Sequence, residues 1–306
     1  MKKVLIATEK PFAKEAVDGI KNIIEQSGHQ CLLLEKYDNK TALLEAVANV
    51  NAIIIRSDIV DEEVLNAAKK LEIVVRAGAG YDNVNLEVAT KNNVVVMNTP
   101  GQNSNAVAEL AIGLMLLAAR HNFNGKSGGE LRGKKLGLHA FGNVSRYLAV
   151  IAHGFGMDVY AFDPFVSAED IARAGVKPVS TVEELYKTCQ YVSLHIPANE
   201  KTNNSINAAL LNLMPKGATL VNTARKEVID EKALLEMFAN RPDFKMVSDI
   251  APKCADEIAQ KFAGRFYFTA KKCGAQTEEA NVNAGMAAAV QITNFFHSGD
   301  KTFQVN

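Results

Sequence analysis

The residues with the clearest chemical potential form a turn in the middle of the chain. In KLGLHAFGNVSRYL, a β-type run leads through Gly142 into an amphipathic helix. In the fingerprint GxGxxG, the three glycines allow a tight turn, a close approach of the backbone to a pyrophosphate, and close packing of helix on strand. Ala140, Gly142 and Ser145 stand in these places. By itself the turn fits either a dinucleotide site or an ordinary strand–helix connection, and we expect Ala140 to adopt an ordinary negative φ.

An acidic residue at the end of the next strand favours a cofactor site. The run DVYAFDP contains Asp163, twenty-one positions after Gly142. An acid at this distance holds the ribose hydroxyls of adenosine and repels the 2′-phosphate of NADP. We therefore predict an NAD site in which Gly142, Asn143 and Val144 contact the pyrophosphate at a helix N-terminus. Asp163 would hold the ribose, and Pro164 beside it belongs to the same predicted cofactor site.

Two arginines in the N-terminal third suggest an anionic substrate. Arg56 in IIIRSD and Arg76 in VVRAG each end a predicted strand. Paired arginines at strand ends are hard to explain by structure alone, and a guanidinium binds phosphate through two parallel hydrogen bonds. We therefore favour a functional role for the pair over a purely structural one, because a phosphate on a substrate would need such cations.

Strands and helices that can position these residues alternate along the chain. We predict strands over 4–7, 52–57, 73–78 and 94–99, and helices over 13–27, 40–50 and 61–71. A second series of strands lies at KLGLHAF, DVYAFD, YVSLHIP, ATLVNTA, KMVSDI and RFYFTA. Apolar runs without alternating polar residues are typical of strands buried on both faces of a parallel sheet. The predicted fold class is α/β, with two doubly wound parallel-sheet domains.

Two longer helices and the C-terminal tail bear on the division into domains. The segment 105–120 is apolar around most of its circumference, which predicts burial at a domain or subunit interface, or in a core. A second long helix is expected over 278–297. The tail KTFQVN that follows it is expected to add a strand to the first domain.

Composition excludes several classes of protein. The 306 residues suit two domains, and 34 basic residues balance 34 acidic ones. This balance gives no electrostatic footprint for nucleic acid or an anionic membrane. The four cysteines show no CxxC spacing, which predicts unpaired thiols, no metal site and a cytoplasmic location. No segment has the length of a signal peptide or a membrane helix.

Several segments in a fixed order make the prediction more specific. They are RAGAGYDNVNLE, NTPGQNSNAVAEL, GFGMDVYAFDP, VSLHIP, LMPKGATLVNTARKEVIDEKAL and GAQTEEANVNAG. Together they resemble the D-isomer-specific 2-hydroxyacid dehydrogenases over nearly the whole chain. The resemblance implies a Rossmann-type NAD domain over 99–276 and a flavodoxin-like substrate domain formed by 1–98 and 277–306. It also implies a homodimer, and because the sequence ends at FQVN we expect no appended regulatory domain.

The resemblance implies roles for further residues. Arg225 in NTARKE matches the catalytic arginine, whose planar fork suits a 2-oxo carboxylate and its carbonyl. The small residues after Arg76 match a loop whose amides hold the substrate carboxylate. The implied substrate-binding residues are Arg56, Arg76, Ala77, Gly78, Ala79, Gly80 and Asn103. The further cofactor-lining residues are His195, Pro197, Thr223, Ala224 and Asp249, the last of which receives the nicotinamide carboxamide.

The family's acid–base pair is altered in this chain. The family places a glutamate five positions after the aspartate matched by Asp249, and Cys254 stands there. Asp256 or Glu257 would replace that glutamate only if the loop rearranges.

A lysine stands where the family has its acid–base histidine. Counting back from Ala280 in the matched segment gives Lys272, whereas counting forward from the strand RFYFT gives Lys271. We favour Lys272 because the denser match lies on the C-terminal side. An ammonium can donate a proton to a developing alkoxide. To act as a base, a lysine with an ordinary pKa of about 10.4 needs its charge disfavoured, which we expect from burial beside Arg225.

The activity implied by the resemblance is the NAD-dependent oxidation of 3-phosphoglycerate to 3-phosphohydroxypyruvate, which begins serine synthesis. Hydride transfer would be supported by Arg225 and Lys272 as catalytic residues. One alternative is a reductase of another 2-oxo acid such as glyoxylate or hydroxypyruvate. A second alternative is a catalytically silent member that binds NAD(H) as a sensor or scaffold.

Overall fold

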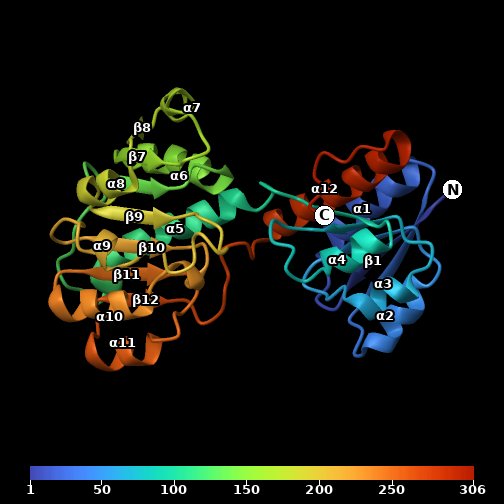
Figure 1. The fold of residues 1–306 in the computed structure, drawn as a ribbon, viewed down its shortest axis with the longest axis horizontal. Helices are drawn as coiled ribbons and strands as arrows, with labels where there is room; N and C mark the ends of the chain where they lie inside the picture. Colours follow the sequence, from blue (N-terminus) through green and yellow to red (C-terminus); the bar gives the residue numbers. More distant parts are fainter. The chain divides into compact units, whose positions relative to one another are not determined.

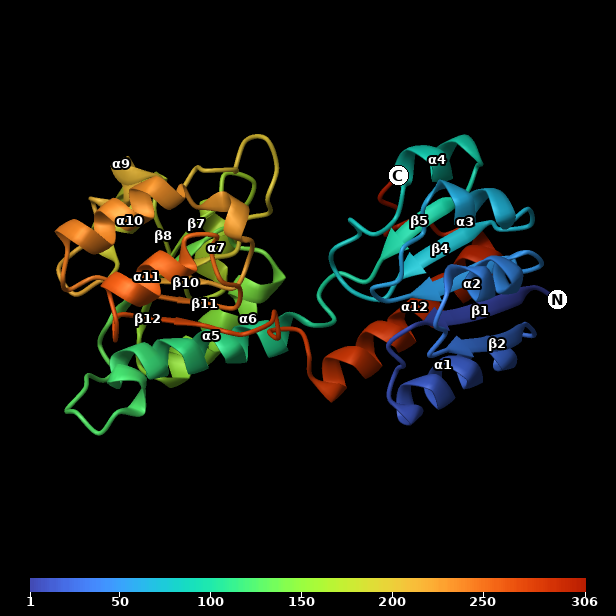
Figure 2. The ribbon, with the colours of Figure 1, turned by 90° about the horizontal axis from the view of Figure 1, so that it is seen from below.

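The β-branched runs form two parallel sheets, one in each of two units of the chain. The computed structural model describes residues 1–306. Its internal contacts divide the chain into unit 1, which comprises Met1–Asn103 and Gln276–Asn306, and unit 2, which comprises Ser104–Ala275. Figures 1 and 2 show helices on both sides of each sheet.

Unit 1 is built around five strands. They are β1 (Lys3–Thr8), β2 (Gln30–Glu35), β3 (Ala52–Ile55), β4 (Ile73–Arg76) and β5 (Val95–Asn98). The helices are α1 (Lys14–Gln26), α2 (Lys40–Val47), α3 (Glu62–Ala67), α4 (Leu86–Lys91) and α12 (Glu278–Ser298). The strand order β2-β1-β3-β4-β5 is that of flavodoxin-like folds, as predicted.

Both faces of this sheet are covered by helices. Val4, Ile6 and Ile54 pack with α1 and α12 on one face, while Leu5 and Ile53 pack with α2, α3 and α4 on the other. Burial on both faces explains why the central strands are unbroken apolar runs. The edge strand β2 is half-exposed.

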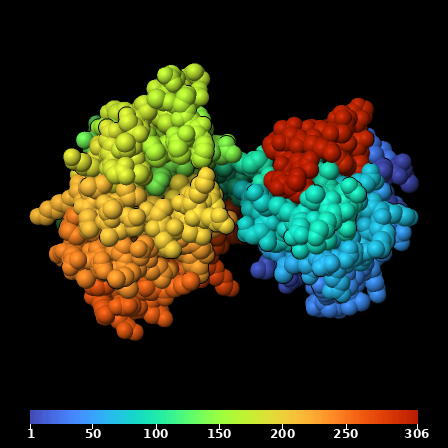
Figure 3. All heavy atoms as spheres, viewed as in Figure 1, coloured from blue at the N-terminus to red at the C-terminus, as the bar shows by residue number.

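The C-terminal segment returns to the first unit. Helix α12 packs against α1, and Figure 3 shows this segment in red against the N-terminal segments in blue and teal. The tail forms an antiparallel bridge between Met97 and Gln304, and the Val305 amide donates to the Val96 carbonyl. The expected addition to the sheet is therefore present as a bridge beside β5.

Unit 2 is built around seven strands. They are β6 (Lys135–His139), β7 (Asp158–Phe162), β8 (Lys177–Pro178), β9 (Tyr191–Leu194), β10 (Thr219–Asn222), β11 (Lys245–Ser248) and β12 (Phe266–Phe268). The helices are α5 (Ser104–Ala119), α6 (Asn143–Gly154), α7 (Ala168–Arg173), α8 (Val182–Thr188), α9 (Ala208–Leu211), α10 (Glu231–Asn240) and α11 (Ala255–Lys261). Two short 3₁₀ helices, η1 (His121–Phe123) and η2 (Lys226–Val228), complete the unit.

The order of these strands places a topological switch beside the predicted cofactor turn. The order is β12-β11-β10-β9-β6-β7-β8, and every pair is parallel. Counted from β6, this is the 3-2-1-4-5-6 order of a Rossmann fold with one further strand. The predicted fold class is confirmed. The order reverses between β6 and β9, where such folds bind dinucleotides.

The long apolar helix α5 belongs to the core of unit 2. It packs on α6 and on strands β10 and β11, and Ala111, Met115 and Ala118 are buried in one cluster with Leu138 and Val221. The core alternative for 105–120 therefore accounts for its apolar character. None of the helices combines the length and the apolar character that a membrane span requires.

Candidate active site

The predicted site residues of unit 2 gather at one edge of its sheet. They follow the carboxyl ends of β6, β7, β9, β10, β11 and β12. Because the strands are parallel, these ends meet at the same edge, where ligands bind in open α/β sheets. The residues placed there are Gly142, Asn143, Val144, Asp163, Pro164, His195, Pro197, Thr223, Ala224, Arg225, Asp249 and Lys272.

The turn after β6 presents an open helix N-terminus. Helix α6 begins at Asn143, and no side chain caps it at Gly142. A Cβ added at Gly142 would meet no protein atom within 4 Å, so the space beside this residue is open. Uncapped amides at a helix N-terminus bind anions such as a pyrophosphate. The N-terminus of α6 presents such amides.

Ala140 does not adopt the negative φ that we expected. Its φ is +83°, in the left-handed region that favours glycine. The expectation was wrong because the chain turns sharply into α6 here, and an alanine in the sequence does not report that angle. The Oγ of Ser145, which is fully buried, donates to the carbonyl oxygen of Ala140 at 2.7 Å. The two positions that lack the fingerprint glycines are therefore in contact.

Asp163 holds the same turn from the neighbouring strand. Its Oδ2 accepts from the amide of Phe141 at 2.8 Å, and its Oδ1 accepts from the amide of Phe165 at 2.8 Å. Strands β6 and β7 are adjacent, which brings this carboxylate to the turn. Arg146, in the first turn of α6, places its guanidinium carbon 4.7 Å from the centroid of the Phe141 ring. This contact restrains the loop between β6 and α6.

Two neutral imidazoles lie beneath the turn. Burial lowers the pKa of His139 to about 4, and the charge of Asp163 opposes this shift. Burial, with a smaller contribution from His139, lowers the pKa of His195 to about 3. His139 Nδ1 lies 3.2 Å from the Tyr186 hydroxyl, and the His195 amide donates to the His139 carbonyl at 3.0 Å.

Three buried polar atoms at this edge have no protein partner. They are Ser193 Oγ, His195 Nε2 and Thr223 Oγ1, at or just beyond the ends of β9 and β10. Buried polar groups are nearly always hydrogen-bonded, and each exception calls for an explanation. A cofactor with hydroxyl and amide groups supplies partners of the right kind, so the residues present fit a dinucleotide.

Arg225 and Lys272 meet after β10. Arg225 Nη1 donates to the carbonyl oxygen of Ala224 at 3.1 Å, and Lys272 Nζ donates to the same oxygen at 3.2 Å. The side chain of Lys271 makes no hydrogen bond within the chain. Lys272 is exposed, so the burial that we expected to disfavour its charge is absent.

Asp249 anchors the loop that carries Lys272. Asp249 is 1% exposed, and its carboxylate accepts from the amides of Cys273 and Gly274, each at 2.8 Å. The Cys273 thiol and the Thr269 hydroxyl lie 3.3 Å from the same carboxylate. Burial and the bond to Asp249 raise the pKa of the Cys273 thiol. The carboxylate is therefore engaged by loop 269–274.

The two arginines of unit 1 lie together. Arg56 Nη1 donates to the carbonyls of Lys10 and Pro11 at 3.3 and 3.0 Å, and Nη2 donates to Asn281 Oδ1 at 2.6 Å. Arg76 Nε donates to the Arg56 carbonyl at 3.0 Å. Burial lowers the pKa of Arg56, against the charge of the nearby Asp58. Arg56 thus has a structural role that the sequence did not reveal.

The loop after β4 leaves its amides available. The carbonyls of Gly78 and Ala79 accept from the Thr99 amide and the Asn98 side chain. The backbone amides of 78–80 donate to no acceptor within the chain. A Cβ at Gly78, whose φ is +146°, would lie 1.6 Å from Arg76 Nη1, so the guanidinium lies over this loop. Asn103 is the last residue of the first of the two segments that form unit 1.

Comparison with known proteins assigns the family. Residues 114–259 match the family model described as D-isomer specific 2-hydroxyacid dehydrogenase, NAD binding domain. Hydroxypyruvate reductase of Thermotoga maritima is 34% identical over 302 residues, which cover 92% of this chain and 95% of that protein. The chain belongs to the D-isomer-specific 2-hydroxyacid dehydrogenase family. The predicted NAD cofactor is confirmed, and residues 114–259 correspond to the NAD-binding domain of these dehydrogenases.

Other members are phosphoglycerate dehydrogenases. That of Methanocaldococcus jannaschii is 34% identical over 267 residues, covering 83% of this chain and 51% of that protein. The chain spans about half the length of the curated phosphoglycerate dehydrogenases that it matches. A solved structure of NAD⁺-bound 3-phosphoglycerate dehydrogenase from Entamoeba histolytica is 44% identical, with a TM-score of 0.88 and coverage of 100% of this chain and 98% of that chain.

Cys254, which stands where the resemblance implies a glutamate, lies beside another carboxylate, that of Glu231. Glu231 accepts from the amides of Lys253 and Cys254 at 2.6 and 3.1 Å. Burial, followed by the charge of Glu231, raises the pKa of the Cys254 thiol to about 11. Of the two acids considered as replacements, Glu257 pairs with Lys261 and Asp256 is exposed in the first turn of α11.

Two residues of the candidate site were missed in the sequence. Asn222 is 1% exposed; its Oδ1 accepts from the Ala224 amide at 3.0 Å and its Nδ2 donates to the Arg225 carbonyl at 2.9 Å. Ser248 Oγ bonds the Asn222 carbonyl at 3.0 Å. These residues fix the turn that carries Arg225, and the only signal was an asparagine at the end of a buried run.

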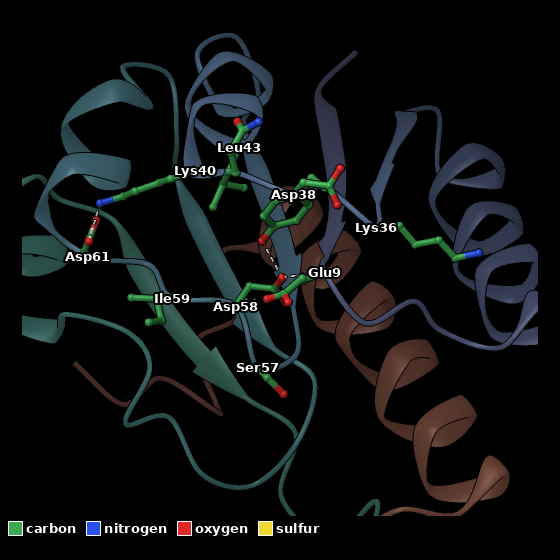
Figure 4. A pocket seen from close by; sticks show the side chains of 11 residues that line it. Glu9, Lys36, Asp38, Lys40, Leu43, Ser57, Asp58, Ile59 and Asp61 are labelled. Atoms are coloured by element: carbon green, nitrogen blue, oxygen red, sulfur yellow. Dashed lines mark hydrogen bonds and ion pairs between the residues drawn. The ribbon is translucent and has the colours of Figure 1, made fainter.

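Unit 1 also contains a cavity of about 640 Å³ at the carboxyl ends of β1, β2 and β3. Figure 4 shows charged side chains of both signs around it, including Glu9, Asp38, Lys40 and Asp58. Asp58 accepts from the Tyr37 hydroxyl at 2.5 Å and from the Arg56 amide at 3.2 Å. None of the predicted site residues lines this cavity.

Proposed function

We propose that this chain is an NAD-dependent D-2-hydroxyacid dehydrogenase that oxidises D-3-phosphoglycerate to 3-phosphohydroxypyruvate, the first step of serine synthesis. The proposal is supported by the family, by the 44% identity to a 3-phosphoglycerate dehydrogenase, and by the arrangement of Arg225 and Lys272. It assigns the cofactor to unit 2 and the phosphate of the substrate to unit 1.

The shared acceptor of Arg225 and Lys272 carries the catalytic part of the proposal. Both side chains reach the carbonyl oxygen of Ala224, so a guanidinium fork and an amine lie side by side at the edge where the cofactor fits. Arg225 would bind the oxygen at C2 and orient the carboxylate. Lys272 would accept the hydroxyl proton during oxidation and return it during reduction.

The cofactor residues would act by binding and orientation. Bound NAD⁺ supplies the hydride acceptor. Gly142, Asn143 and Val144 would hold the pyrophosphate at the N-terminus of α6, and Asp163 would hold the ribose. His195, Pro197, Thr223, Ala224, Asp249 and Pro164 would line the remainder of the cofactor.

The substrate residues would act through positive charge and free amides. Arg76, supported by Arg56, would bind the phosphate. The amides of Gly78, Ala79 and Gly80, which donate to no acceptor within the chain, would bind the carboxylate together with Ala77 and Asn103.

A second candidate is the reduction of unphosphorylated hydroxypyruvate. It is favoured by the 34% identity over 95% of the Thermotoga maritima hydroxypyruvate reductase. It is also favoured by the three hydrogen bonds that already occupy the guanidinium of Arg56.

One series of assays separates these candidates. NADH oxidation is followed by absorbance with 3-phosphohydroxypyruvate, hydroxypyruvate and glyoxylate, with NADH binding measured separately by fluorescence. We expect kcat/KM to be highest for the phosphorylated acid. A higher value for hydroxypyruvate would favour the second candidate. Tight NADH binding without turnover of any of the three would contradict both and indicate a silent member.

A further inference from the structure

The two departures from the dinucleotide fingerprint form a single hydrogen-bonded unit. Ala140 replaces the first glycine and Ser145 replaces the third. The hydroxyl of Ser145 donates to the carbonyl of Ala140 at 2.7 Å, and the serine side chain is fully buried. A sequence with glycine at both positions contains no such bond.

The backbone of Ala140 needs support that a glycine does not. Its φ is +83°, and a Cβ makes this region less favourable than negative φ, whereas glycine populates both signs about equally. The Ala140 amide donates to the Phe162 carbonyl at 2.9 Å, which fixes the residue to β7 on one side only.

The peptide between Ala140 and Phe141 is held at both ends. Its carbonyl oxygen accepts from Ser145, and its N–H donates to Asp163 Oδ2 at 2.8 Å. One restraint comes from α6 and the other from the end of β7. The orientation of this peptide sets the path of the backbone into Gly142 and into the amides at the N-terminus of α6.

We propose that Ser145 is a positioning residue for NAD, and that its hydroxyl keeps Ala140 in the left-handed conformation on which the pyrophosphate turn depends. This inference rests on the proposed placement of NAD at Gly142. Removal of the hydroxyl lets Ala140 return to negative φ and rotates the 140–141 peptide. Only the fraction of molecules with the correct turn then binds the cofactor, and the apparent Kd rises by the inverse of that fraction.

The dependence on Ser145 should disappear when residue 140 is glycine. In a Ser145→Ala variant with alanine at 140, we expect the competent fraction to fall to about one tenth, which raises the Kd for NADH about tenfold. In Ala140→Gly, both signs of φ are accessible without cost. In Ala140→Gly/Ser145→Ala, the competent fraction stays near one half, so the Kd rises about twofold over the Ala140→Gly variant.

The experiment measures the Kd of NADH by fluorescence titration for the full chain and for these three variants. Ser205→Ala is the matched control, because Ser205 Oγ also donates to a backbone carbonyl at 2.7 Å, that of Thr202, in the same unit. Thermal unfolding without cofactor is recorded for each variant. The inference is supported if Ser145→Ala raises the Kd about tenfold with alanine at 140 but only about twofold with glycine at 140, while Ser205→Ala binds NADH like the parent.

Two outcomes would overturn the inference while leaving the proposed function intact. One is a parent that binds NADH and a Ser145→Ala variant that binds it equally well. The other is an equal rise in Kd in the alanine and glycine backgrounds, which would show that the hydroxyl and residue 140 act independently. A parent that binds no NADH would instead contradict the proposed cofactor site itself.

Discussion

Lys272 and Arg225 donate to the same carbonyl oxygen, that of Ala224, at 3.2 and 3.1 Å. The guanidinium and the amine therefore lie side by side after β10, at the edge of the sheet where we propose that the cofactor binds. We propose that this amine takes the acid–base role in turnover.

Replacement of Lys272 by alanine should therefore abolish turnover and spare cofactor binding. We expect kcat to fall at least about a hundredfold, the usual contribution of a positioned acid–base group. The Kd of NADH should stay within about twofold of the parent, because no cofactor contact is assigned to this side chain. Steady-state kinetics and fluorescence titration measure the two quantities.

Lys271→Ala is the control for this prediction. Lys271 is the neighbouring exposed amine, whose side chain makes no hydrogen bond within the chain, and its removal should leave kcat close to that of the parent. A large loss in Lys271→Ala with none in Lys272→Ala would reverse the assignment of the acid–base residue.

Asp249→Asn should disorder the loop that carries Lys272. The Asp249 carboxylate accepts from two backbone amides, those of Cys273 and Gly274. An asparagine side chain has one oxygen and one NH₂ group, so one of these backbone amides would face another donor. That buried amide loses its partner, at a cost of about 1–3 kcal/mol. We expect a lower free energy of unfolding and a lower kcat, measured by urea denaturation and by the NADH assay. Asp256→Asn, which changes an exposed acid of the same unit, should alter neither; equal effects in both variants would refute the anchoring role.

Arg56→Ala should affect both stability and substrate preference. The change removes three hydrogen bonds within unit 1 and a cation that supports the proposed phosphate site. We expect a lower melting temperature and at least a tenfold loss of kcat/KM for 3-phosphohydroxypyruvate, with hydroxypyruvate affected less.

Asn281→Ala separates the two effects of Arg56. It removes one hydrogen-bond partner of Arg56 but keeps the guanidinium, so it should lower stability and retain the preference for the phosphorylated acid. If Arg56→Ala lowers kcat/KM by the same factor for 3-phosphohydroxypyruvate and hydroxypyruvate, Arg56 does not contribute to phosphate binding.

The buried imidazole of His139 should make the protein less stable in acid. Its pKa in the folded state is about 4, against about 6.5 in the unfolded chain, so the unfolded state binds more protons between these values. Stability is therefore complete above about pH 6.5 and falls as the pH decreases toward 4, by up to about 1.4 kcal/mol per pH unit for this group. In His139→Gln this slope should be smaller, as measured by urea denaturation at pH 7, 6 and 5.

His297→Gln serves as the control for the acid effect. His297 is exposed at the end of α12, and its replacement should leave the slope unchanged. If His139→Gln shows the slope of the parent, the neutral buried state of this imidazole is refuted.

The sequence predicted those features that depend on local pattern. Unbroken apolar runs identified the central strands β1, β3 and β4 because strands covered on both faces need apolar side chains throughout. The edge strand β2 lacks this burial, with Leu33 50% exposed, and was missed. The short helix α4 was also missed because six residues give too few turns for a clear period.

Features that depend on contacts between distant residues could not be predicted. The left-handed φ of Ala140 results from the turn into α6, and the bond from Ser145 needs that turn to exist first. Asp249 meets Cys273 only after β11 and β12 pair. The structural bonds of Arg56 come from Asn281, which lies near the other end of the chain. In each case the residue type was visible and its partner was not.

The most direct test of the account is the formation of NADH from NAD⁺ on addition of D-3-phosphoglycerate, followed by absorbance and compared with D-glycerate under the same conditions. The account predicts NADH formation with D-3-phosphoglycerate at a kcat/KM at least about tenfold above that for D-glycerate, the factor that corresponds to 1.4 kcal/mol of transition-state binding. Absence of NADH formation with D-3-phosphoglycerate, from a protein that binds NADH, would contradict it.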